Sequence, residues 1–342
     1  MKNRLKFIDI SRGIAIILIV YSHTISYSPL LRSSLKFIKG FHIALFFVLS
    51  GYTFSIRNKE FFEFTKQKFY RIILPYLFWA FTFLVPYFIL GQQIGDILQK
   101  NSNYNFVSLI YNIMYGVGAG GALKQNTSLW FLPALFSMEV IYYFIIKITD
   151  KYPNCRFFFT IMIFILGYLF TNYLNYNLPF GFNTVIAFGI FFYIGYLTKD
   201  YDVFSTRGYI IKMLLLFIFG CICVTFNSQV GAVDYKYGNY FLFFGSGLFL
   251  SILTIMVSNY IENNYTLEYI GKNTMGILIF HKLIIILFQT KITFFSYYLK
   301  KGCFASQVIT SLFVTTISII ISLYISKWIR YLFPTLIGEE KK

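Results

Sequence analysis

An arginine and a histidine lie eleven residues apart in the first apolar segment, and together they could bind an anion and transfer a proton. Eleven α-helical steps turn about 1100° and rise about 16.5 Å, so Arg12 and His23 share one helix face at different depths. Asp9 precedes Arg12 by three residues, close enough to pair with the guanidinium and orient it. Because ionisable side chains in a membrane helix usually face the protein interior or a wet cavity, this stripe is the leading candidate for a functional site.

Arg12 and His23 also have ordinary interpretations. Arg12 could snorkel to lipid phosphates at one membrane surface, and His23 could lie among the headgroups at the other. The placement of a carboxylate, a cation and an imidazole on one face favours a functional role over two independent anchors.

Two further histidines complete the supply of imidazoles in the chain. His42 begins the second apolar segment at about the level of His23, and His281 lies inside a late segment. These three are the candidates for proton transfer near neutral pH. Ser50 and Gly51 lie deeper in the second segment, where they could stabilise an oxyanion, admit a slender ligand, or serve only close helix packing.

Other candidate side chains occur around the next two segments. The basic connection that holds Arg57 and Arg71 could bind a phosphorylated cofactor or lipid headgroups. Pro75 is expected to start or kink the third helix. Trp130 opens the fourth segment at the level of the aromatic belt, where it could also stack on a sugar ring. Glu139 falls in the middle of that segment, as a paired carboxylate or as part of a polar path.

The elements that position these residues follow from the composition. The 342 residues are 57% hydrophobic, 22% aromatic and 13% charged, which is too much apolar surface for one soluble core. We expect an all-α, polytopic membrane protein of about ten transmembrane helices. The predicted spans are 10–29, 37–56, 70–90, 129–148, 157–175, 183–198, 209–227, 239–258, 273–290 and 306–328. They form a single membrane domain over residues 1–342, with an outer loop at about 91–128, a short interfacial helix from Phe106 to Tyr115, and no appended soluble domain.

The charges follow membrane topology rather than a nucleic-acid surface. The net charge is +17, but most lysines and arginines fall in alternate connections, and this bias places both termini in the cytoplasm. No nucleic-acid partner is expected. The four cysteines are scattered, and Cys221 and Cys223 lie in an apolar segment without a nearby histidine. We therefore expect buried thiols, no disulfide framework and no metal site.

Several different short motifs occur in a specific order along nearly the whole chain. Asp9, Arg12 and His23 lie in the first of about ten helices. The later motifs are Phe46-Phe47-Val48-Leu49-Ser50-Gly51-Tyr52, Arg71-Ile72-Ile73-Leu74-Pro75-Tyr76, Trp130-Phe131-Leu132 and Phe280-His281. This set resembles the acyltransferase-3 family of bacterial membrane acyltransferases. Leu283 departs from the pattern, because many members have a proline after the late histidine, and the departure bears on the role of His281.

The resemblance implies transfer of an acyl group, usually acetyl from acetyl-CoA, to sugar hydroxyls of cell-envelope polysaccharides or their lipid-linked precursors. Acetyl-CoA or another acyl-CoA is then the co-substrate. The expected location is the bacterial cytoplasmic (inner) membrane. The expected partners are the lipid bilayer, a carbohydrate acceptor and proteins of polysaccharide biosynthesis.

The stripe on the first helix suits such a reaction. Arginine grips phosphates in a fork, and the pantetheine arm of CoA is comparable in length to the rise from Arg12 to His23. We expect Arg12, oriented by Asp9, to bind the CoA phosphates with Arg71 and Arg57. His23 is expected to act as general base on the acceptor hydroxyl or to carry the acyl group transiently. The supporting residues are expected to be His42 beside His23, Ser50 and Gly51 near the donor, and Trp130, Glu139 and His281 near the acceptor.

Transport is the competing class of function. Ten helices with buried charges would also suit an exporter or flippase for a sugar or an organic anion, with Arg12, Glu139 and His281 along the path. The chain lacks two halves of matching hydropathy, which weakens this interpretation. A non-catalytic subunit of a polysaccharide synthase is a third interpretation.

Overall fold

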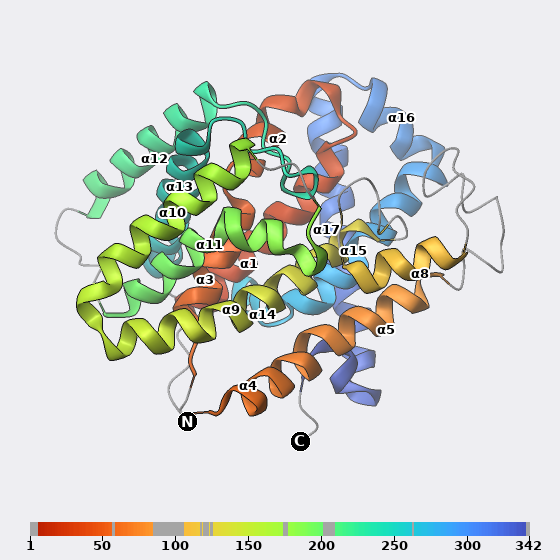
Figure 1. Ribbon diagram of the computed structural model, residues 1–342. Coiled ribbons are helices and arrows are strands. Elements are labelled where there is room, and N and C mark those ends of the chain that lie inside the picture. The colour runs from red at the N-terminus through yellow and green to blue at the C-terminus, as the bar shows by residue number, and fades with distance from the viewer. Residues whose placement is uncertain are drawn as a thin grey trace.

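The computed structural model describes a helical chain. It covers residues 6–56, 59–84, 106–116, 118, 123, 126–173, 177–200, 209–261 and 263–339. Among these residues the only β-type pairing is one isolated antiparallel bridge between Gly231 and Lys236. The predicted all-α class is confirmed for the described residues, whose helices form the bundle drawn in Figure 1.

The helices follow one another with short connections. The first half of the chain holds α1 (Lys6–Ile25), η1 (Pro29–Leu31), α2 (Arg32–Lys39), α3 (His42–Thr53), α4 (Phe61–Lys68), the π-helical turn η2 (Phe69–Ile73), α5 (Leu74–Thr82), α8 (Phe106–Tyr115), η4 (Thr127–Trp130), α9 (Phe131–Lys151), η5 (Pro153–Cys155) and α10 (Arg156–Tyr173). The second half holds η6 (Pro179–Gly181), α11 (Phe182–Leu197), η7 (Thr198–Asp200), α12 (Tyr209–Phe226), η8 (Ala232–Asp234), α13 (Tyr240–Ile261), α14 (Tyr265–Lys272), α15 (Thr274–Thr290), α16 (Thr293–Lys301), α17 (Phe304–Leu332) and η9 (Pro334–Ile337).

Eight of the described helical segments are long and apolar enough to cross a membrane, or nine when one bent pair is taken as a single span. This agrees with a prediction of about ten. The predicted span 70–90 is described only as far as residue 84, and its described part consists of η2 and α5. Pro75 lies in the first turn of α5, directly after the π-helical turn η2, and Ile73 before α5 is itself helical (φ −77°, ψ −40°). Of its two predicted roles, a helix start or a kink, Pro75 therefore coincides with a distortion inside a continuous helical stretch.

The second span differs from its prediction at both ends. It runs from Pro29 to Thr53 rather than over 37–56, and it consists of η1, α2 and α3 in succession. The break between α2 and α3 falls at Gly40 and Phe41. Lys36 and Lys39 occupy the last turn of α2, where cations stabilise the carboxyl end of a helix. A basic stretch that hydropathy assigns to a loop is therefore helical.

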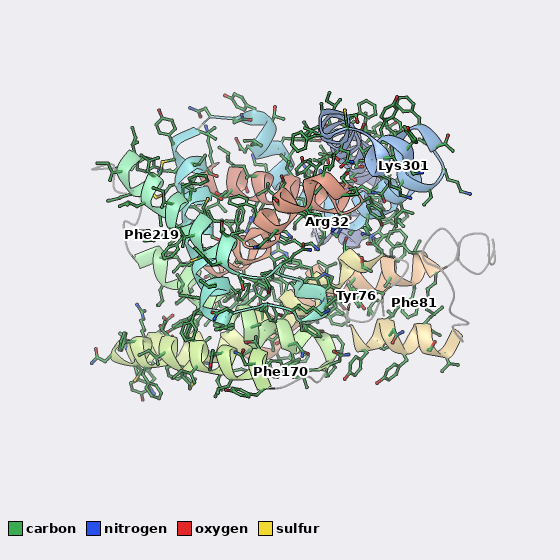
Figure 2. The ribbon with its side chains drawn as sticks, turned by 90° about the horizontal axis from the view of Figure 1, so that it is seen from above. Arg32, Tyr76, Phe81, Phe170, Phe219 and Lys301 are labelled. Carbon is green, nitrogen blue, oxygen red and sulfur yellow. The ribbon has the colours of Figure 1, made fainter. Side chains whose placement is uncertain are left out.

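Two helices present apolar side chains to the surroundings. Only 11% of the most apolar window of α10, and the same fraction of α12, is buried inside the protein. Phe219 of α12 is 50% exposed and lies at the rim of the bundle when the molecule is seen from above (Figure 2). A long helix that buries so little of an almost wholly apolar surface is suited to contact lipid.

Helix α1 lies at the centre of the packing. It contacts α2, α3, α13, α14, α15 and α17. Its closest neighbour is α14, because a Cβ added at Gly13 would overlap the Leu267 carbonyl oxygen and one added at Gly271 would overlap the Asp9 carbonyl oxygen. Two glycines thus allow backbone contact between these helices, as small residues commonly do in membrane proteins.

The late span that carries His281 is broken. Helices α14 and α15 are bent by 84° at Asn273. The Asn273 side chain accepts a hydrogen bond from Arg330 Nη2 at 2.6 Å and donates one to the Tyr269 carbonyl at 2.7 Å. The predicted span 273–290 matches α15 (Thr274–Thr290), whereas the bend that directs α15 toward α1 was not foreseen.

Two smaller predictions have mixed outcomes. A helix from Phe106 to Tyr115 is present as α8, whereas most of the outer loop at about 91–128 lies outside the described residues. The four thiols are free, as expected, but Cys155 and Cys303 are exposed rather than buried. The prediction of buried thiols is wrong at these two positions, which lie at helix termini, because Cys155 ends η5 and Cys303 precedes α17. It is not confirmed at Cys221 and Cys223 either, because both are only partly buried on α12.

Candidate active site

Two antiparallel helices, α1 and α3, form the frame of the candidate site. Arg12 and His23 are eleven residues apart in α1, and His42 and Thr53 are eleven residues apart in α3. Arg12 contacts Thr53 at one end of the pair, and His23 and His42 line one cavity at the other end. The helical rise separates the two ends by about 16.5 Å. Arg12 and His23 therefore both lie on the face of α1 that meets α3.

The arginine end is built from two helices. Arg12 Nη2 donates to Thr53 Oγ1 at 2.9 Å, and Arg12 Nη1 lies 3.9 Å from Asp9 Oδ1. The Thr53 hydroxyl in turn donates to the Leu49 carbonyl at 2.9 Å. The Asp9 side chain is 1% exposed, whereas that of Arg12 is 27% exposed. The guanidinium is thus oriented from its inner side and keeps accessible surface for an anion.

The histidine end brings three helices together. His23 of α1 and His281 of α15 have ring centroids 5.3 Å apart, and His42 of α3 lines the same cavity as His23. Lys282 Nζ lies 3.3 Å from His23 Nδ1, and Ser128 Oγ lies 3.4 Å from His281 Nε2. All three histidines of the chain therefore belong to one cluster, which we call the imidazole cluster: His23, His42, His281, Lys282 and Ser128.

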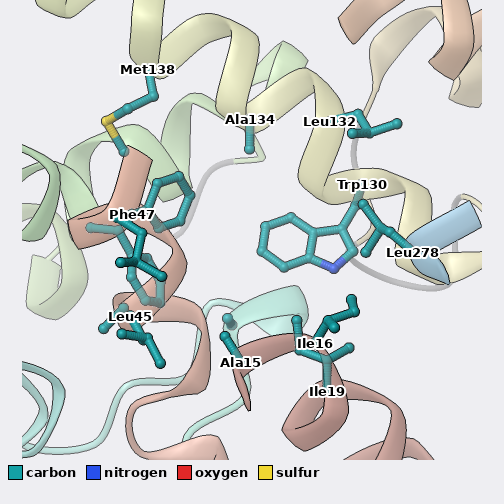
Figure 3. Close-up of a cluster of buried hydrophobic side chains, with 14 of the residues drawn as sticks. Ala15, Ile16, Ile19, Leu45, Phe47, Trp130, Leu132, Ala134, Met138 and Leu278 are labelled. Carbon is teal, nitrogen blue, oxygen red and sulfur yellow. The ribbon is translucent and has the colours of Figure 1, made fainter. Parts of the chain in front are cut away.

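A cavity of about 130 Å³ lies beside the imidazole cluster. Lys39 and Asp234 bring one charge of each sign to its wall. The Trp130 indole forms an apolar wall with Ile19 and Leu278, and Figure 3 shows the ring between these side chains and Phe47. The cavity therefore combines a polar side, suited to proton transfer, with an apolar side, suited to an acyl group or a sugar ring.

A loop between α12 and α13, residues 227–239, covers this cavity. Its residues 230–234 contribute to the wall. Asn227 fixes the loop, because its Oδ1 accepts from the backbone amides of Ser228 and Asn239 and its Nδ2 donates to the Tyr237 carbonyl. Burial, as the largest cause, raises the pKa of Tyr235 to about 12, so this hydroxyl stays protonated beside Asp234. The covering loop is thus held by its own hydrogen bonds.

Arg71 and Gly51 were predicted to bind the acyl-CoA donor, and they lie on different helical segments. Arg71 is exposed on η2, which packs chiefly on α4, α5, α9 and η9. Arg57 lies outside the described residues. Gly51 lies against the Phe192 carbonyl, while Gly195 of α11 lies against the Val48 carbonyl, so this pair of glycines brings α3 and α11 into close contact. The packing interpretation of Gly51 therefore has direct support.

Two more predicted residues do not reach the imidazole cluster. Ser50 lies eight residues along α3 from His42, which is about 12 Å of helical rise, so the structure gives no support to an oxyanion role for it there. Glu139 of α9 forms an ion pair with Lys68 of α4 at 3.0 Å, and its side chain is 10% exposed. Glu139 was predicted to be either a paired carboxylate or part of a polar path, and the ion pair with Lys68 matches the first of these.

The structure also assigns importance to residues that sequence reasoning missed. Thr53, Ser128, Lys39 and Asp234 were not predicted, and Lys282 was noticed only for its position in a span. A hydroxyl eleven residues after His42 repeats the spacing of Arg12 and His23, and this signal could have identified Thr53. No sequence signal of this kind links Lys282 to His23, because the two are 259 residues apart.

The chemistry available at the imidazole cluster is proton transfer and hydrogen-bond donation. Lys282 lies 3.3 Å from His23, Ser128 lies 3.4 Å from His281, the His23 and His281 rings are 5.3 Å apart, and His42 lines the same cavity as His23. Among the residues that the structure describes, no group of three or more His, Cys, Asp or Glu side chains could hold a metal ion. The described site thus offers nitrogen bases and cations rather than a metal-ligand set.

Comparison with known proteins adds one finding. A family model described as an acyltransferase domain, Acyl_transf_3, matches residues 5–327, which is nearly the whole chain. The match includes both ends of the α1–α3 pair and the broken span of α14 and α15. Searches of curated proteins and of solved structures returned no match.

Proposed function

This chain belongs to the acyltransferase-3 family, and we propose that it moves an acyl group, acetyl in the first instance, from cytoplasmic acyl-CoA to a sugar hydroxyl. The acceptor is a cell-envelope polysaccharide or its lipid-linked precursor. The family and the candidate spans together make the protein a multi-pass membrane acyltransferase. The acyl donor, the acyl group and the acceptor are the proposed part.

The observation that carries the proposal is the separation of two kinds of chemistry along α1 and α3. An oriented guanidinium lies at one end, and the imidazole cluster lies at the other. The distance of about 16.5 Å suits a donor that has phosphates at one end and a thioester at the other. A thioester delivered to the cavity would then lie beside nitrogen bases that can take a proton from a hydroxyl.

In the proposed reaction the protein has to remove one proton and supply another. An imidazole takes the proton of the acceptor hydroxyl as its oxygen attacks the thioester carbonyl carbon. The carbon–sulfur bond breaks, and the sulfur leaves as a thiol after it receives a proton. His23 and His42 line the cavity and are the candidate bases. The His281 ring lies next to the His23 ring. Transient transfer of the acyl group to an imidazole is the covalent variant of the same reaction.

The proposed location is the bacterial cytoplasmic membrane with both termini inside. The bias of lysine and arginine toward alternate connections supports this orientation. The arginine end of α1 then faces the cytoplasm, where acyl-CoA is made, and the imidazole cluster lies toward the outer side. The proposed partners are the bilayer, the carbohydrate acceptor and other proteins of polysaccharide biosynthesis.

One observation favours a transporter as the second candidate. Helices that break near the middle of a span commonly line transport sites, and α14 and α15 meet at 84°. A flippase or exporter of a sugar or an organic anion would place this break beside its path. The family match makes acyl transfer the first candidate.

Transfer of radiolabelled acetyl from acetyl-CoA to envelope carbohydrate tests the proposal directly. Membranes that contain the wild-type protein, His23→Ala or Arg12→Ala are compared at equal amounts of inserted protein. Label in carbohydrate with the wild type, and its loss in both variants, supports acyl transfer. No label with acetyl-CoA, succinyl-CoA or other short acyl-CoA donors would contradict it. Movement of an unmodified sugar across the membrane would then favour transport.

A further inference from the structure

The three imidazoles of the cluster are held in two different ways. His42 Nδ1 lies 2.7 Å from the Ile38 carbonyl oxygen, and His281 Nδ1 lies 2.7 Å from the Ile277 carbonyl oxygen. In both cases the partner is the backbone carbonyl four residues earlier. A carbonyl only accepts, so Nδ1 carries the proton in these two rings and Nε2 is left with its lone pair.

His23 lacks this arrangement. The carbonyl four residues before it belongs to Ile19, and that oxygen accepts the Ser22 hydroxyl at 2.8 Å. His23 Nδ1 instead faces Lys282 Nζ at 3.3 Å, from a helix 259 residues away in sequence. An ammonium donates three hydrogen bonds and accepts none. Beside an ammonium, His23 Nδ1 must therefore be the acceptor, and the ring proton lies on Nε2.

We propose that Lys282 is a positioning residue that keeps the proton of His23 on Nε2. His23 and His42 then have opposite hydrogen-bonding roles toward the cavity. His23 Nε2–H is a donor, and His42 Nε2 is an acceptor. Two identical side chains thereby take two different roles, in the way that a second group usually selects the tautomer of a functional histidine.

The surroundings of His23 come from three other helices and the covering loop. Lys282 and His281 face it from α15, His42 from α3, and Lys39 from the end of α2. Asp234 of the covering loop lies across the same cavity from this group. Among these neighbours, Lys282 is the cation for which the structure gives a hydrogen-bond distance to His23, so it is the side chain that selects the tautomer.

The consequence for acyl transfer rests on the proposed function. His42 Nε2 takes the proton of the acceptor hydroxyl, and the hydroxyl oxygen forms a bond to the thioester carbon. His23 Nε2–H donates first to the carbonyl oxygen and then to the sulfur as the carbon–sulfur bond breaks. His23 Nδ1 receives a proton from the Lys282 ammonium at the same time. The products are the ester and the free thiol, with His42 protonated, His23 carrying its proton on Nδ1 and Lys282 neutral. Return of the Nδ1 proton of His23 to Lys282, and passage of the Nε2 proton of His42 to His23 Nε2 through water, restore all three groups.

The three histidines make the tautomers measurable without any substrate. Nuclear magnetic resonance of protein labelled with ¹⁵N in histidine distinguishes Nδ1–H from Nε2–H rings, and single His→Gln variants assign each ring. In the wild-type protein we expect His42 and His281 to carry Nδ1–H and His23 to carry Nε2–H. Lys282→Met removes the hydrogen-bond donor but keeps a side chain of similar length. Lys282→Arg keeps a cationic hydrogen-bond donor.

We expect Lys282→Met to move the His23 proton away from Nε2 and to leave the His42 and His281 signals unchanged, which also reports that the variant is folded. Lys282→Arg should retain Nε2–H. Turnover of short acyl-CoA should fall about 100-fold in Lys282→Met, and Lys282→Arg should restore part of it. A wild-type His23 ring with Nδ1–H, or an unchanged His23 ring in Lys282→Met, overturns the proposal.

The outcome is separable from the proposed function. If the wild-type tautomers are as expected but no acyl-CoA supports transfer, Lys282 still positions His23, and the division of labour in acyl transfer is overturned. If transfer occurs but His23 carries Nδ1–H, the enzyme is an acyltransferase and Lys282 does not set its tautomer.

Discussion

The two ends of the α1–α3 pair are built on the same spacing but differ in every other respect. At the arginine end, one guanidinium with 27% exposure is held by a carboxylate and a hydroxyl. At the histidine end, three imidazoles and an ammonium border a cavity under the covering loop. A pair of ordinary helices thus holds a guanidinium and an imidazole cluster about 16.5 Å apart, and the proposed reaction assigns anion binding to the first and proton transfer to the second. Mutations at the histidine end should then lower turnover, whereas mutations at the arginine end should raise the KM for acyl-CoA.

The largest effect is expected from the histidine end. His42→Gln removes the nitrogen that we assign as the base, and turnover should fall by about 10²–10⁴-fold, because general-base catalysis contributes this much. The KM for acyl-CoA should stay close to that of the wild type. Steady-state rates in membranes measure both values.

Lys36→Gln is the matched control for His42→Gln. It removes a cation from α2 whose Nζ donates to the Thr225 carbonyl at 2.9 Å, outside the lining of the cavity. Its turnover should equal that of the wild type. If His42→Gln retains full turnover, the two ends do not differ as proposed.

The next largest effect is expected at the arginine end. Arg12→Lys keeps the charge but loses the planar fork, so the KM for acyl-CoA should rise about tenfold with turnover nearly unchanged. An acyl thioester of N-acetylcysteamine, which has no phosphates, should be used equally by the variant and the wild type. Equal loss with both donors would show that Arg12 does not act on the phosphates.

A smaller effect is expected from the hinge of the broken span. Asn273→Ala removes the hydrogen bond from Arg330 and the one to Tyr269, so it loosens the base of α15. Turnover should fall about fivefold, which corresponds to about 1 kcal/mol, the net value of one hydrogen bond. The KM for acyl-CoA should not change, since Arg12 is held by α1 and α3.

Asn172→Ala is the control for Asn273→Ala. The Asn172 side chain donates to the Tyr168 carbonyl at 2.8 Å on the exposed helix α10. Its loss should leave both kinetic parameters unchanged. A change of KM in Asn273→Ala would indicate that the two ends are coupled through α14, which packs directly on α1.

The smallest effect is expected from Thr53. Thr53→Val keeps the shape of the side chain but removes the acceptor for Arg12 Nη2, and the KM for acyl-CoA should rise about threefold. Thr53→Ser retains the hydroxyl and should behave like the wild type. An unchanged KM in Thr53→Val would show that Asp9 alone is sufficient to orient the guanidinium.

Local geometry made part of the site predictable. The shared face of Arg12 and His23 and the placement of Asp9 follow from the helical repeat, which depends only on neighbouring residues. The number and class of the helices follow from apolar runs of about 20 residues. Pro75 was placed correctly at a helix distortion, because its ring removes a backbone donor and disturbs the preceding turn whatever the tertiary contacts are.

Tertiary contacts made the rest unpredictable. The 84° bend at Asn273 depends on Arg330 of α17, and the role of Lys282 depends on a contact with α1. The sequence favoured packing over ligand access for Gly51, and only its position against α11 gives that interpretation direct support. Helix α2 was missed because hydropathy scores Lys36 and Lys39 as loop residues, whereas they complete a short helix.

The size of the cavity has a consequence for chain-length selectivity. A protein cavity of about 150 Å³ accommodates one benzene molecule, and the cavity beside the imidazole cluster measures about 130 Å³. Under the proposed function, a cavity of this size favours a two-carbon acyl group over a fatty acyl chain. Trp130, Ile19 and Leu278 set this limit from the apolar side. Replacing the indole by a small side chain would therefore be the route to an enzyme that accepts longer acyl donors.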